Sequence, residues 1–150
     1  MSTAGFRLYD GPQNIQWFPE DATSGSFAAG NVVILSSGEV TIATDDLDIW
    51  GVALKGYTGT AGTMIPVQVV TPNQRWLAYA TSTTATTIIG TAYALTLTAD
   101  NQGVNTASTT THGFMVEDIL TSSKTAGATT GAGGMVIGRF FYDACDAIGG

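Results

Sequence analysis

Short apolar runs separated by turn-forming residues constrain the fold of this chain more than any other feature. The runs predict strands at residues 6–9, 15–18, 32–35, 40–43, 49–57, 65–70, 76–80, 88–97, 114–119 and 135–142. The segments between them are rich in Gly, Pro, Asn and Asp, which supply the backbone geometry of turns. Many short strands at this spacing are typical of a sandwich or barrel, whereas a parallel sheet needs intervening helices.

Local patterns within these runs indicate antiparallel strands. In the 65–70 run, Ile65, Val67 and Val69 share one face because side chains alternate along a strand. Residues 36–39 predict a hairpin turn, in which Gly38 supplies a positive φ. Residues 19–22 are the best candidate for a helical turn. We therefore predict an all-β fold: a small antiparallel β-sandwich, jelly-roll-like, or a barrel module, with an N-terminal arm.

Charge excludes several classes of partner. Charged residues make up 11% of the chain, against about 25% in an average soluble domain. The net charge is −7, and the five basic residues are scattered singly, whereas nucleic-acid binders cluster Lys and Arg to neutralise phosphates. No apolar run of about 20 residues predicts a membrane span. We therefore expect neither a nucleic acid nor a membrane as partner.

Length favours a single domain with an N-terminal extension. A chain of 150 residues can bury a sufficient core without disulfides or metals. We predict an N-terminal arm at residues 1–14 and one β domain at 15–150. Within this domain, residues 121–134 are rich in Thr, Ala and Gly and predict a flexible loop.

The predicted arm is apolar, so we expect it to find a sheet edge, its own or a partner's. Its removal is expected to leave the fold intact and to weaken docking. The predicted contact residues for a capsid or a second subunit are Phe6, Arg7, Leu8, Tyr9, Trp17 and Phe18.

Residues that carry catalysis are sparse. His112 and Cys145 are the only residues of their types, whereas a zinc site needs several such ligands. Ser108 lies outside any Gly-x-Ser-x-Gly elbow, which argues against a triad with His112 and Asp118. Glu117 and Asp118 are adjacent, so on a strand they point to opposite faces and cannot flank one bond. We expect no enzymatic activity, no catalytic residue and no cofactor.

Two features leave other kinds of ligand open. Asp45, Asp46 and Asp48 form an acidic cluster that lacks the regular ligand series of a calcium loop. It is interpreted as a solvated loop, with ion binding as the alternative. Trp50 and Trp76 lie in apolar runs and are interpreted as core or interface residues. A sugar-stacking platform is the alternative, and with it a carbohydrate-binding β-sandwich.

Residues 28–120 carry a longer pattern. It begins with a Gly turn that leads into a strand at 28–33, continues through Gly38-Glu39-Val40 and an acidic loop, and reaches Gly51-Val52-Ala53. A second Gly turn at 58–62 leads to the strand at 65–70, and the stretches at 90–95 and 113–116 follow. This succession resembles the head-decoration (cement) proteins of tailed bacteriophages.

The resemblance implies a function. Such proteins form homotrimers on the outer capsid surface, bridge neighbouring major capsid proteins and carry no catalytic residues. It implies that this chain is made in the bacterial cytoplasm and located on the virion, with the major capsid protein and its own copies as partners. Another phage structural subunit, such as a tail, fibre or minor head protein, is the alternative.

Overall fold

The computed structural model describes residues 5–21, 26–44, 49–81, 84, 86–98, 101–120 and 134–141. Within these ranges the chain forms eleven strands, a single 3-10 turn and no α-helix. The elements are β1 Phe6–Asp10, β2 Ile15–Pro19, β3 Val32–Ser36, β4 Glu39–Ile42, β5 Gly51–Ala53, β6 Met64–Val69, β7 Arg75–Tyr79, η1 Thr86–Ile88, β8 Ala92–Thr98, β9 Asn101–Asn105, β10 Phe114–Ile119 and β11 Met135–Phe140. The predicted all-β fold is confirmed.

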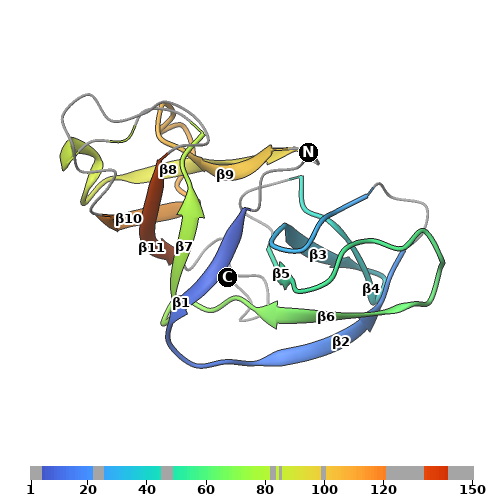
Figure 1. Cartoon of the computed structure of the whole chain (residues 1–150). Coiled ribbons are helices and arrows are strands. Elements are labelled where there is room, and N and C mark those ends of the chain that lie inside the picture. Colours follow the sequence, from blue (N-terminus) through green and yellow to red (C-terminus); the bar gives the residue numbers. More distant parts are fainter. Residues whose placement is uncertain are drawn as a thin grey trace.

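The strands form two antiparallel sheets that pack as a sandwich (Figure 1). One sheet has six strands in the order β1-β7-β11-β10-β8-β9, and the other has five in the order β2-β6-β5-β3-β4. In the six-stranded sheet, an isolated parallel bridge joins Val104 of the edge strand β9 to Ala80, which follows β7. In the five-stranded sheet, a second bridge joins Val40 of the edge strand β4 to Glu20, which follows β2. These single bridges do not close either sheet into a barrel.

The main core lies between the sheets and is centred on aromatic side chains. Phe140 contacts three other rings, with centroid distances of 5.1 Å to Phe6, 5.3 Å to Phe114 and 5.7 Å to Trp76. Strands of the five-stranded sheet add aliphatic side chains such as Val32 and Val52. A smaller apolar cluster, which includes Phe27 and Ile65, covers the opposite face of the five-stranded sheet. The five-stranded sheet is therefore apolar on both faces.

Residues 6–10 belong to this sandwich. Strand β1 pairs with β7, with Phe6 opposite Ala78 and Leu8 opposite Trp76. Phe6 is 4% exposed, and its N–H donates to the carbonyl of Gly30 at 2.8 Å. Of the two sheet edges that the arm was expected to find, residues 6–10 thus occupy the edge of the chain's own sheet. Because Phe6 is part of the core, loss of this strand would remove a core side chain.

Most predicted strands are present, with local differences. The β3–β4 hairpin turn is confirmed, with φ of 52° at Ser37 and 83° at Gly38. The predicted strand at 49–57 narrows to β5, and the strand predicted at 88–97 begins only at Ala92, after η1. The helical turn at 19–22 is wrong, because Pro19 ends β2 and Glu20 bridges to Val40.

Strand β9 lies between the strands predicted at 88–97 and 114–119, in a segment whose Asn and Gly content is typical of a turn and predicted no strand. The predicted loop at 121–134, the acidic cluster Asp45, Asp46 and Asp48, and Cys145 lie outside the described residues, except for Gly134.

Candidate interaction surface

Strand β2 lies at an open edge of the five-stranded sheet. Its inner side pairs with β6, with Ile15 opposite Gln68 and Trp17 opposite Pro66. The chain reaches β2 directly from β1, so residues 6–19 form the outer border of both sheets (Figure 1).

The pairing pattern shows which backbone groups of β2 point outward. Val69 N–H donates to the carbonyl of Asn14 at 2.9 Å, and Glu20 N–H donates to the carbonyl of Thr63 at 2.8 Å. In an antiparallel ladder the bonded residues alternate, so the even-numbered positions of β2 bond to β6. Ile15 and Trp17 therefore direct their N–H and C=O groups away from the sheet. Pro66, which lies opposite Trp17, agrees with this assignment: a hydrogen-bonded pair needs an N–H from both residues, and proline has none.

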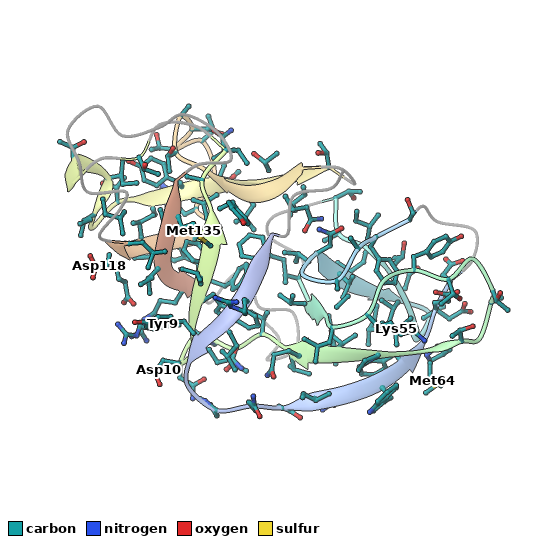
Figure 2. The ribbon with its side chains drawn as sticks, in the orientation of Figure 1. Tyr9, Asp10, Lys55, Met64, Asp118 and Met135 are labelled. Atoms are coloured by element: carbon teal, nitrogen blue, oxygen red, sulfur yellow. The ribbon has the colours of Figure 1, made fainter. Side chains whose placement is uncertain are left out.

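Exposed apolar side chains surround this edge. We define the β2 patch as Ile15, Trp17, Leu54 and Met64, each at least 46% exposed and led by Trp17 at 59%. The register places them on one face: Met64 lies opposite Pro19, two pairs beyond the Trp17–Pro66 pair, and Leu54 N–H donates to the carbonyl of Pro66. Figure 2 labels Met64 at the outer end of the five-stranded sheet. Exposed apolar side chains gathered in this way mark interaction surfaces.

A cavity of about 390 Å³ lies where this face meets the six-stranded sheet. Its walls are mainly apolar and include Leu8, Ile15, Val52, Leu54 and Trp76. Gln13 and Gln68 supply polar atoms, and Arg7 is the charged residue of the wall. The β2 patch is thus continuous with a recess large enough for one or two side chains of a partner.

Few charged side chains lie along the edge formed by β1 and β2. Asp10 pairs with Arg75 at 3.4 Å, and the Arg75 guanidinium lies 5.5 Å from the centre of the Tyr9 ring. Figure 2 shows Tyr9 and Asp10 together near the end of β1. Residues 11–19 contain no charged side chain. Sheet edges are commonly protected by Lys or by inward-pointing charges, and this edge has neither.

Glu20 ends the open edge. Its buried carboxylate accepts hydrogen bonds from Thr58 N–H at 2.9 Å, from Thr60 N–H at 2.8 Å and from the Thr58 hydroxyl. Gly59, with φ of 83°, turns this loop so that successive N–H groups form an anion-binding concavity. The contact fixes the 58–60 loop to the end of β2.

Burial of the Glu20 carboxylate raises its pKa, but the hydrogen bonds from Thr58, Thr60 and Gly59 together outweigh burial, so the pKa lies below its ordinary value. A lowered folded pKa stabilises the protein above the unfolded pKa of about 4.3, and this stabilisation is lost as pH falls through the folded value.

Replacing Glu20 with Gln is expected to reduce the free energy of unfolding by about 1–2 kcal/mol at pH 7, because the neutral amide cannot accept all of these bonds. The difference from the unsubstituted protein should shrink below about pH 4. Urea unfolding between pH 3 and 7 measures this, with Glu39→Gln as the control that removes the same charge. A difference that does not change with pH would contradict the role of the ionised carboxylate.

The predicted contact residues have different positions in the structure. Arg7, Tyr9 and Trp17 are exposed, whereas Phe6 lies in the core, where it lines the cavity. Leu8 is partly buried against the main core, and Phe18 is partly buried against the smaller cluster. Three of the four residues of the β2 patch, Ile15, Leu54 and Met64, were not predicted as contact residues. The pairing of β6 with β2 on one side and with Leu54 on the other brings these residues to one face. The sequence carries only the alternation of Ile15 and Trp17 as a signal.

The described residues contain no group of three or more His, Cys, Asp or Glu that could hold a metal ion. His112 is exposed, with its ring 5.9 Å from that of Phe141. Glu117 forms a salt bridge with Arg139 at 2.7 Å, and an oxygen of Asp118 accepts from the Ile119 N–H. In the described part of the chain, no helix is long and apolar enough to cross a membrane.

Comparison with protein-family models, with curated proteins and with solved structures found no match. The β2 patch and its adjoining cavity therefore carry the functional interpretation.

Proposed function

We propose that this chain is a non-enzymatic structural protein of a bacteriophage particle that binds the outer surface of the icosahedral capsid. It bridges neighbouring major capsid proteins and thereby stabilises the shell. The observation that carries this proposal is the β2 patch, an exposed apolar face beside a recess on an otherwise low-charge β-sandwich. The resemblance of residues 28–120 to cement proteins supplies the kind of partner.

The physical basis of the stabilisation is mass action. A protein that binds only the assembled shell shifts the equilibrium toward assembly. Contacts with several capsomers add avidity of roughly 10²–10⁴-fold over one contact when the geometry permits. Individual contacts can then be weak, which suits a surface with four exposed apolar side chains and few charges.

The proposal predicts that the protein co-sediments with expanded capsids purified from the phage that encodes it. Leu54→Lys is expected to reduce binding about tenfold, because it places a charge in the apolar contact. Ile89→Lys adds the same charge at another exposed apolar position and is the matched control. Equal binding by both variants would remove the β2 patch from the contact. A wild-type protein that does not co-sediment would contradict capsid binding itself.

Cryo-electron microscopy of purified particles separates the proposal from its alternatives. A sandwich on the outer shell supports the decoration role, whereas the same density in the tail, in fibres or at a minor head position supports another structural subunit. The exposed indole of Trp17 favours carbohydrate binding as a second candidate, because aromatic faces pack against sugars. A glycan array without hits would remove that candidate.

A further inference from the structure

We infer that the open edge of β2 binds β2 of a second copy, forming a two-fold dimer with a continuous sheet across the interface. The inference goes beyond capsid binding and does not depend on it. It rests on the register of β2, on the uncharged composition of its edge and on the pairing of its exposed side chains.

The backbone groups of the edge are self-complementary. The outward N–H and C=O groups belong to Ile15 and Trp17, two positions apart on the strand. If two antiparallel copies meet with Gln16 on the two-fold axis, Ile15 of one lies opposite Trp17 of the other, and the reverse holds. Each Ile15 then exchanges two backbone hydrogen bonds with Trp17 of the other copy. This gives two bonds on each side of the axis and four in all.

The side chains match in the same register. On one face, Ile15 of each copy meets Trp17 of its partner, an aromatic and β-branched pair of the kind that stabilises sheets. On the other face, the exposed side chain of Gln16 meets its own copy, and two amides can donate and accept in both directions. No charged side chain between residues 11 and 19 opposes the approach, although each chain carries a net charge of −7.

The edges at β4 and β9 offer less room for a second copy. The end of β4 is tied to Glu20 by the parallel bridge, with Asp21 N–H donating to the carbonyl of Val40 at 3.0 Å. Likewise, Val104 of β9 bridges to Ala80 and accepts from Thr81 N–H at 2.9 Å. Pro19 lacks an N–H and ends the usable part of β2. The pairing is therefore short and fixed in register, since a shift of one residue would misplace every bonding group.

The interface is small. A five-residue strand is about 17 Å long, whereas a stable interface usually buries about 800 Å² on each partner. The dimer should therefore be reversible, with a dissociation constant in the micromolar range or weaker. A closed two-fold pair also differs from the homotrimer that the resemblance implies, so the mass of the protein in solution distinguishes them.

Sedimentation velocity of the full chain from about 1 µM to about 1 mM tests the inference across this expected range of affinity. A monomer–dimer equilibrium is expected. Ile15→Pro removes two of the four bonds while leaving the inward ladder of Asn14, Gln16 and Phe18 intact, and Pro is tolerated at such an edge position. Trp17→Lys replaces the aromatic partner with an edge-protecting charge, and each variant should weaken dimerisation about tenfold or more. Ile89→Lys, which adds the same charge elsewhere, should dimerise like the wild type.

Hydrogen exchange gives a second readout that does not depend on the variants. The amides of Ile15 and Trp17 should exchange rapidly in dilute protein and become protected as concentration rises. A wild-type protein that remains monomeric or forms a trimer would overturn the inference, as would dimers that persist in both edge variants. Because capsid co-sedimentation is measured separately, a monomer that still binds capsids would refute the dimer and leave the proposed function standing.

Discussion

Replacing Phe6 with alanine is expected to lower the free energy of unfolding by about 4 kcal/mol, a large fraction of the stability of a domain of this size. The ring is almost fully buried and contacts Phe140 at 5.1 Å and Phe114 at 6.1 Å. Its removal leaves a void between the sheets and weakens the attachment of β1 to the core. Chemical denaturation followed by tryptophan fluorescence measures the change.

Tyr9→Ala is the matched control, because Tyr9 belongs to the same strand but is 53% exposed. It should change stability by no more than about 0.5–1 kcal/mol. If Phe6→Ala instead left stability unchanged and impaired assembly alone, β1 would behave as the partner-seeking arm that its apolar composition predicts. Equal losses in the two variants would also contradict the assigned burial.

Replacing Gly138 with alanine is expected to destabilise the protein by about 3 kcal/mol, the upper part of the range for overpacking. Gly138 lies in β11 and pairs with Val116 on one side and Trp76 on the other. A Cβ there would overlap the carbonyl oxygen of Met115 and lie 2.7 Å from the ring of Phe114. Because the obstruction is backbone, side-chain rotation cannot relieve it.

Gly56→Ala is the control for the loss of glycine itself. Its added Cβ would lie 3.7 Å from the nearest heavy atom, an ordinary contact, and stability should change by about 0.5 kcal/mol or less. Thermal unfolding by circular dichroism compares the two variants. A Gly138→Ala protein as stable as Gly56→Ala would show that β10 and β11 can separate to admit the methyl group.

Parts of the fold that depend on neighbouring residues were predictable from the sequence. The β3–β4 turn follows from Ser37-Gly38, whose backbone geometry is local. Strand β9 was not predictable, because Gln102 and Gly103 have the composition of a turn. The Gln102 side chain accepts from Val32 N–H at 2.6 Å, and a Cβ on Gly103 would overlap the carbonyl of Tyr79. Both partners are distant in the sequence, so no local pattern indicates this strand.

The residues of the candidate site were likewise predictable only in part. Trp17 was predicted as a contact residue and is exposed, yet Phe6 and Phe18 have similar apolar surroundings in the sequence and are buried or partly buried. The distinction depends on which face of each strand meets the other sheet. Leu54 and Met64 reach the patch only through the pairing of β5 and β6 with their neighbours. Ladder register therefore sets the site, and a single sequence does not specify register.

The position of β11 has a consequence for synthesis of the chain on the ribosome. All strands of the five-stranded sheet lie between residues 15 and 69, so this sheet can form early. The six-stranded sheet cannot, because β11 is the last described strand to emerge and lies between β7 and β10. At about 10 residues per second, the 71 residues from Val69 to Phe140 take roughly 7 s to translate. Until β11 emerges, the nascent chain exposes Trp76 and the unpaired side of β7, and it exposes Phe114 once that residue has been made. The chain therefore most needs protection by a chaperone during this interval.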